Sequence, residues 1–162
     1  MNADVSIGFL ADAPRHIEIL AQWHHSEWKL LYSDWTRAVA EAELADHATR
    51  RTMPTTLVAT RKDVLLGSVS LVEVDAEELA HYGGPWLASL YVAPEYRGRK
   101  LGAVLVKALV AHAAAQGVET LRLFTTDHVD YYRRQGWQLE TRTDLNGTPV
   151  SILSIRPQQA LP

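Results

Sequence analysis

The chain has 162 residues, of which 47% are hydrophobic, with a formal net charge of −3 and no cysteine. This length suits one domain with a proper core, expected over residues 1–156, followed by a flexible tail at 157–162. The slightly acidic balance argues against a general nucleic-acid binder, because no basic excess neutralises a phosphate backbone. The lack of cysteine excludes disulfides, thiolate metal sites and a cysteine nucleophile. With no apolar run of membrane-spanning length and no signal pattern, we expect a cytoplasmic protein.

The first half of the chain alternates between strand-like and helix-like patterns. The expected elements are a strand, two helices, two strands and a polar loop, at 5–10, 14–31, 35–51, 55–61, 64–74 and 75–85. Pro14 suits the first turn of a helix, and Asp12 is a candidate cap before it. A tight turn at 61–63 joins the two neighbouring strands.

The second half continues the alternation without a linker or a repeat. A strand, a long helix, a strand, a short helix and two closing strands are expected at 86–92, 101–116, 120–125, 128–135, 137–143 and 149–155. Gly117 lies where a left-handed helix end is wanted, and Asp127 is the expected N-cap of the short helix. Asn146 and Gly147 form a hairpin signal between the closing strands.

A short basic turn separates the strand at 86–92 from the long helix. The first amides of a helix lack intrahelical partners and carry the positive end of its dipole, so they bind phosphate well. Arg97, Arg99 and Lys100 lie beside those amides in the sequence. Gly98 and Gly102 let a ligand approach the backbone closely. The turn therefore predicts an anion site, and the alternative is a basic surface turn that only caps the helix.

A second motif, at 130–137, follows about thirty residues later with one strand between. It contains the pair Tyr131 and Tyr132 and closes with Gly136 and Trp137. On its own, this pattern is also typical of a short helix with aromatic core contacts that ends at a glycine.

In this order and spacing, the two motifs resemble the GCN5-related N-acetyltransferase (GNAT) superfamily, and the resemblance covers nearly the whole chain. The family pattern Arg/Gln-x-x-Gly-x-Gly/Ala is met at its first and last positions by Arg97 and Gly102, whereas Lys100 replaces the middle glycine. The preceding stretch 90–96 also looks like a family motif. The resemblance implies an α+β fold with a mixed, mostly antiparallel sheet of about seven strands. Helices would cover both faces, and the fourth and fifth strands would splay apart.

The resemblance also implies acetyl-CoA, or a related acyl-CoA, as the donor. The pyrophosphate would lie on the amides from Arg97 to Ala103, and the pantetheine arm would pair with backbone around Leu90 and Val92. Tyr132 matches the family position whose phenol lies near the thioester sulfur, where it would protonate or hydrogen-bond the departing CoA thiolate. The residues implied in donor binding are Leu90, Tyr91, Val92, Arg97, Gly98, Arg99, Lys100, Leu101, Gly102, Ala103 and Tyr132.

The general base is harder to place. Family members often carry Glu or His on the fourth strand at the positions of Ala88 and Trp86, and neither of these side chains can take a proton. We expect Glu27, late in the first helix, to act as the base. The alternatives are a water chain or one of His24, His25, Glu73, His81, Tyr82, Asp127 and His128. No metal is expected, because residues one or two apart on a helix do not share a face.

The chain is thus predicted to acetylate a primary amine by direct attack through a tetrahedral intermediate. The acceptor is a small amine or a peptide N-terminus, since 123–132 also looks like the part of the superfamily that acetylates acid-rich protein N-termini. Five aromatic residues either line a cation-friendly pocket or belong mostly to the core: Trp23, Trp28, Trp35, Tyr82 and Trp86. No nucleic acid or membrane partner is expected, and the chain is a monomer or a homodimer. The alternative function is a non-catalytic acyl-CoA sensor or interaction module of the same fold.

Overall fold

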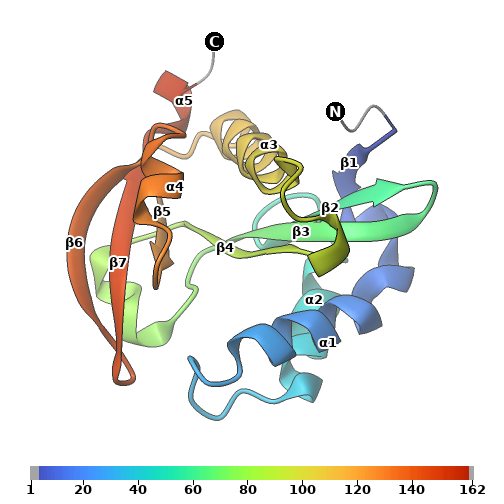
Figure 1. Ribbon diagram of the computed structural model, residues 1–162, viewed down its shortest axis with the longest axis horizontal. Helices are drawn as coiled ribbons and strands as arrows, with labels where there is room; N and C mark the ends of the chain where they lie inside the picture. The colour runs from blue at the N-terminus through green and yellow to red at the C-terminus, as the bar shows by residue number, and fades with distance from the viewer. Residues whose placement is uncertain (1–3, 161–162) are drawn as a thin grey trace.

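The computed structural model describes residues 4–160 and is built around one mixed sheet (Figure 1). Within this range the sheet has seven strands in the order β1-β2-β3-β4-β5-β7-β6. Their bounds are β1 Ser6–Phe9, β2 Thr55–Arg61, β3 Val64–Val72, β4 Trp86–Val92, β5 Leu121–Thr125, β6 Gln138–Leu145 and β7 Thr148–Ile155. Every neighbouring pair is antiparallel except β4 and β5. The predicted α+β class is confirmed.

Helices cover both faces of the sheet, as Figure 1 shows with α3 on one side and α1 and α2 on the other. The helices are α1 Ile17–Trp28, α2 Arg37–His47, α3 Leu101–Ala115, α4 Val129–Arg133 and α5 Pro157–Ala160. Short 3-10 helices lie at Leu10–Asp12, Pro14–His16, Glu77–Tyr82 and Pro94–Tyr96. Alternation along β2 explains the two layers, because Leu57 and Ala59 pack with α3 while Val58 packs with α1 and α2.

Strands β4 and β5 separate almost as soon as they meet. Their register contains the single pair Trp86 and Arg122. Beyond that pair, β4 carries an irregularity opposite Ser68–Ser70 of β3, and Ser89 adopts a positive φ of 56°. The diverging strands leave backbone groups without strand partners beside the N-terminus of α3. The predicted splay of the fourth and fifth strands is confirmed.

The tight turns follow the sequence signals. Lys62 and Asp63 have φ values of 47° and 69°, and Asn146 and Gly147 have 49° and 89°. Two consecutive positive φ angles give the turn whose twist matches antiparallel strands. Gly117, with φ of 80°, lies just after α3. Both hairpins and this left-handed helix end agree with the prediction.

The two predicted acidic caps are wrong. Asp12 lies in a 3-10 turn and pairs with Arg51, and no side chain caps the start of α1. Asp127 precedes the N-cap residue of α4, which is His128. The backbone N–H of His128 donates to Thr125 Oγ1 at 3.1 Å, so a threonine from the end of β5 satisfies the amide.

Two segments expected to be irregular contain ordered turns. Glu77–Tyr82 forms a 3-10 turn inside the loop predicted at 75–85. In place of the flexible tail expected from 157, Pro157–Ala160 forms α5, and Gln158 Nε2 donates to the Ala114 carbonyl at 2.6 Å. The last two residues of that tail lie outside the described range. Among the described helices, none has both the length and the apolarity needed to cross a bilayer.

Candidate active site

The basic turn takes a conformation that exposes the first amides of α3. Gly98 has φ of 80°, and Lys100, the N-cap residue of α3, has φ of 62°. A left-handed backbone favours glycine, which explains why the matching family position is usually glycine. No side chain in the described range caps this helix end. The amides of Leu101 to Ala103 therefore point out of the helix without an intrahelical partner.

Gly102 joins the two sequence motifs in space. A Cβ built on Gly102 would lie 2.8 Å from the Tyr131 hydroxyl oxygen, closer than real Cβ contacts allow. The backbone here is helical, so the reason for glycine is this close approach and not its φ angle. The spacing between the two motifs thus reflects a direct contact between the first turn of α3 and α4.

Arg97 is held against the end of β4. Its Nε donates to the Val92 carbonyl at 2.8 Å, and its guanidinium lies 5.4 Å from the centre of the Tyr91 ring. Arg97 therefore fixes the path of the chain between β4 and α3, in addition to bringing positive charge to the turn.

A cavity of about 550 Å³ lies over the turn and is called here the basic cavity. Its lining includes nine of the eleven residues expected to bind the donor, namely Leu90, Tyr91, Val92, Arg97, Gly98, Lys100, Leu101, Gly102 and Tyr132. Arg99 lies instead in a neighbouring hollow of about 650 Å³ beside β1. Ala103 lines neither space.

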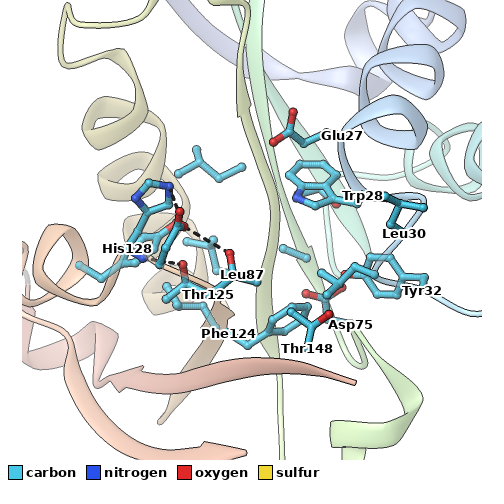
Figure 2. Close-up of a pocket in the computed structure, with 18 residues that line it drawn as sticks. Glu27, Trp28, Leu30, Tyr32, Asp75, Leu87, Phe124, Thr125, His128 and Thr148 are labelled. Atoms are coloured by element: carbon cyan, nitrogen blue, oxygen red, sulfur yellow. Dashed lines mark hydrogen bonds and ion pairs between the residues drawn. The ribbon is translucent and has the colours of Figure 1, made fainter. Parts of the chain in front are cut away.

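A second cavity of about 440 Å³ opens between the splayed strands and the end of α1, and is called the central cavity (Figure 2). The two cavities share five lining residues, which define their junction: Glu27, Trp28, Leu90, His128 and Tyr132. The structure therefore brings together the last turn of α1, the middle of β4 and the start of α4. A molecule that fills the basic cavity reaches the central cavity at this junction.

Tyr132 is the buried phenol at the junction. Tyr132 is 7% exposed. The centre of its ring lies 5.1 Å from that of Tyr131 and 6.1 Å from that of Trp137. Burial, with a smaller contribution from Tyr131, raises the pKa of Tyr132 above its usual value, so the phenol is protonated at neutral pH. Its hydroxyl makes no hydrogen bond to any residue from 4 to 160. The hydroxyl is free to donate to a ligand.

Glu27 and His128 are the two titratable side chains at the junction besides Tyr132. Figure 2 shows them on opposite sides of the gap, Glu27 from α1 and His128 from the start of α4. Glu27 is exposed, and His128 Nε2 lies 3.2 Å from Asp127 Oδ1. Asp127 lines the central cavity only.

The other expected bases are placed elsewhere. His24 is buried, with its Nε2 2.9 Å from Ser68 Oγ, and burial lowers its pKa to about 3, so it is neutral. His25 Nε2 donates to the Trp35 carbonyl at 3.2 Å. Three further candidates line neither the basic nor the central cavity: Glu73, His81 and Tyr82.

Two residues that the sequence did not single out for the site form its most unusual contact. Tyr32 Oη donates to Asp75 Oδ1 at 2.7 Å, and both residues line the central cavity (Figure 2). Burial raises the pKa of the Asp75 carboxyl to about 7, opposed by the Tyr32 hydrogen bond and aided by the negative charge of Glu43. Tyr32 and Asp75 are 43 positions apart in the chain. The sequence patterns predicted only the end of a helix near Tyr32 and a loop that contains Asp75.

Ala88 and Trp86 occupy β4 as expected. Ala88 lines the central cavity, whereas Trp86 is in the core with 1% exposure. Trp28 and Tyr32 line the central cavity, whereas Trp86 belongs to the core, so the aromatic side chains serve both purposes. The small side chain of Ala88 leaves this part of the cavity open, and Asp75 is one of three carboxylates in the lining, with Glu27 and Asp127.

The fold and the two joined motifs agree with the family comparison. Residues 18–137 match the model of the Acetyltransferase (GNAT) family, and the chain belongs to this family. The amino-acid acetyltransferase of Mannheimia succiniciproducens is 25% identical over 142 residues, which is 88% of this chain and 28% of that protein. The chain thus spans little more than a quarter of that relative's length.

Solved structures share the fold at low sequence identity. An aminoglycoside 6′-acetyltransferase type Ii superposes with a TM-score of 0.72 at 18% identity, covering 97% of this chain and 98% of that one. The protein yncA of Salmonella typhimurium, solved with its cofactor acetyl-CoA, gives 0.70 at 15% identity, covering 95% and 94%. Within residues 4–160, no three or more His, Asp or Glu side chains are grouped to hold a metal ion.

Proposed function

We propose that the chain transfers an acetyl group from acetyl-CoA to a primary amine, with Tyr132 as the acid that protonates the departing thiolate. The observation that carries the proposal is the position of Tyr132, a protonated and unengaged phenol where the basic cavity opens into the central cavity. Family membership supports the reaction class.

The residues of the basic cavity fit the donor. Free amides at the start of α3, together with Arg97 and Lys100, suit a pyrophosphate. The single register pair between β4 and β5 leaves β4 backbone around Leu90 and Val92 able to pair with an extended amide-bearing arm. Acetyl-CoA would supply an acetyl group already activated as a thioester.

At the junction, Glu27 and Tyr132 would each carry out one proton transfer of the reaction. The bound ammonium loses one proton to Glu27, and the neutral amine then attacks the acetyl carbon to give a tetrahedral intermediate. As this intermediate collapses, the carbon–sulfur bond breaks, Tyr132 gives its proton to the sulfur, and the nitrogen loses its second proton to water. Glu27 is proposed as the base, and His128, whose Nε2 lies 3.2 Å from Asp127 Oδ1, is the second candidate at the junction. Water then restores both residues to their starting protonation states.

The central cavity favours a small amine over an acid-rich peptide N-terminus as acceptor. Its lining holds the carboxylates Glu27, Asp75 and Asp127 and, among described residues, no lysine or arginine. An amine approaches as its ammonium form and is attracted by such a surface, whereas an acidic peptide is repelled. The relatives' acceptors, amino acids and aminoglycosides, also carry amino groups.

Tyr132→Phe tests the proposal. Loss of the hydroxyl should lower kcat by roughly tenfold to a thousandfold with little change in acetyl-CoA affinity, because the proton is needed only as thiolate leaves. CoA release measured with a thiol reagent gives kcat, and calorimetry gives affinity. Tyr131→Phe, which removes the hydroxyl of the neighbouring tyrosine, is the matched control, and its kcat should fall less.

The same experiment separates the enzyme from a non-catalytic sensor. A sensor would bind acetyl-CoA but release no CoA with any amine. Equal turnover of Tyr132→Phe and the unaltered protein would remove Tyr132 as the acid. A loss in Tyr131→Phe as large as that in Tyr132→Phe would also count against the assignment.

A further inference from the structure

A third cavity continues from the central cavity beneath the connection between α1 and α2. This side cavity has a volume of about 430 Å³ and shares four lining residues with the central cavity: Tyr32, Asp75, Ala88 and Ser89. The space beyond the junction therefore does not end at the central cavity but extends past Asp75.

The charge of this extended space is one-sided. The side cavity is lined by five carboxylates: Asp34, Glu43, Asp75, Glu77 and Glu78. Among the described residues, no lysine or arginine lines either the central or the side cavity. Two histidines line the side cavity, the buried His24 and the half-buried His47. Desolvation lowers the pKa of both, so they do not balance the negative charge.

Asp75 lies where the two cavities meet and lacks a cationic partner. Tyr32 holds Oδ1 at 2.7 Å, while no residue from 4 to 160 donates a hydrogen bond to Oδ2. Nearby Glu43 repels its charge, and Trp35 Nε1 donates to Glu43 at 2.7 Å, which keeps that second carboxylate in place. A half-buried carboxylate beside a second carboxylate and without a positive partner is disfavoured in its charged form, and an ammonium group beside it would offset that cost.

The lining suits an organic cation better than a metal ion. No three of these acidic side chains are grouped to coordinate a metal among the described residues. Trp28, Tyr32 and Trp35 contribute aromatic surface to the two cavities, and aromatic faces attract ammonium groups. Carboxylates spread along an aromatic-walled space match a flexible molecule with separated positive charges.

We infer that the acceptor carries a second cationic group, which binds Asp75 between the central and side cavities while its reacting amine lies at the junction. This inference rests on the proposed acetyl transfer and names its substrate class, an alkyl diamine or polyamine-like molecule. Figure 2 shows Asp75 and Tyr32 at the end of the central cavity away from Glu27, so the two amino groups would be held at opposite ends.

Three probes of equal chain length test this on the unaltered protein: an α,ω-diamine, the n-alkylamine and the ω-amino carboxylate. Diamines of three to eight carbons define the best spacing. At the best length, kcat/KM should fall in the order diamine, monoamine, amino carboxylate, with roughly a tenfold step between the first two. Equal values for diamine and monoamine at every length would overturn the inference while leaving acetyl transfer standing.

Asp75→Asn tests whether the preference for the diamine over the monoamine comes from the Asp75 carboxylate. This variant keeps an acceptor oxygen for Tyr32 but loses the charge, so the diamine-to-monoamine ratio should fall toward one. Glu41→Gln removes one charge from an exposed α2 residue that lines neither cavity, and it should keep the ratio of the unaltered protein. An unchanged ratio in Asp75→Asn would overturn the assignment. Should Asp75→Asn fail to fold, Tyr32→Phe, which removes the hydroxyl that donates to Asp75 Oδ1, should also lower the ratio.

A binding measurement separates the two proposals if no amine is acetylated. Calorimetry with CoA-saturated protein should show tighter binding of the diamine than of the monoamine, and this difference should be lost in Asp75→Asn. That result without turnover would refute acetyl transfer and retain the cation site. Equal binding of both probes would refute the cation site.

Discussion

The basic cavity and the acid-lined cavities beyond it are built in opposite ways. The basic cavity uses backbone amides, glycines and two cations that lie within a few residues of one another at the start of α3. The central and side cavities use side chains from α1, the loops after α1 and β3, and the start of α4. In the proposed assignment, the first would bind the donor and the second would select the acceptor. The two parts differ in charge and meet only at the junction.

The largest expected effect breaks the basic cavity. Gly102→Asp places a carboxylate among the amides proposed to hold phosphate and forces the Tyr131 hydroxyl aside. We expect CoA affinity to fall by roughly a hundredfold or more, since the change adds charge repulsion to a steric clash. Calorimetry with CoA gives the measurement.

Gly102→Asn is the matched control, because it has the same shape without the charge. It should lose affinity through the clash alone, so less than Gly102→Asp. Adding Arg97→Ala to Gly102→Asp should weaken binding further. Unchanged CoA affinity in the double variant would overturn the donor site.

The next effect concerns the acid-lined cavities and appears as a pH dependence of stability. The folded pKa of Asp75, about 7, lies above its ordinary value of 3.8. The folded state therefore holds a proton that the unfolded chain has lost, and stability falls as pH rises from about 4 to about 7, by up to ~1.4 kcal/mol per pH unit. Asp75→Asn cannot titrate, so its free energy of unfolding should exceed that of the unaltered protein increasingly over this range.

Urea denaturation at pH 5 and pH 7 measures this difference, which should grow by about 2 kcal/mol between the two values. The free energy of unfolding of Glu41→Gln should match that of the unaltered protein at both pH values. Parallel curves for Asp75→Asn and the unaltered protein would show that Asp75 has an ordinary pKa, and would contradict the prediction that its surroundings disfavour its charged form.

The smallest expected effect lies in the basic turn. Lys100 has a left-handed backbone with φ of 62°, which costs a non-glycine residue about 1 kcal/mol. Lys100→Gly relieves that strain but adds freedom to the unfolded chain, so stability should change by less than about 1 kcal/mol. Loss of the charge should weaken CoA binding a few-fold at low salt and less at high salt. A loss of CoA affinity that does not depend on salt would show that Lys100 acts through the shape of the backbone and not through its charge.

The sequence by itself determined features that are encoded over a few consecutive residues. The turn at 97–102, the glycine and aromatic pattern at 131–137 and the two hairpin turns predicted the family, the order of elements and nine residues that line the basic cavity. Such patterns suffice because helix starts and tight turns depend on local φ angles and on small side chains at fixed positions.

Only the tertiary structure decided how the cavities meet and what charge they carry. The separation of β4 from β5 after one register pair opens the junction, and helix packing places Glu27 opposite His128. The contact between Tyr32 and Asp75 joins segments 43 residues apart. Asp75 and Tyr32 were missed because a carboxylate in a loop gains its raised pKa only from the elements that bury it, and no local pattern records that burial.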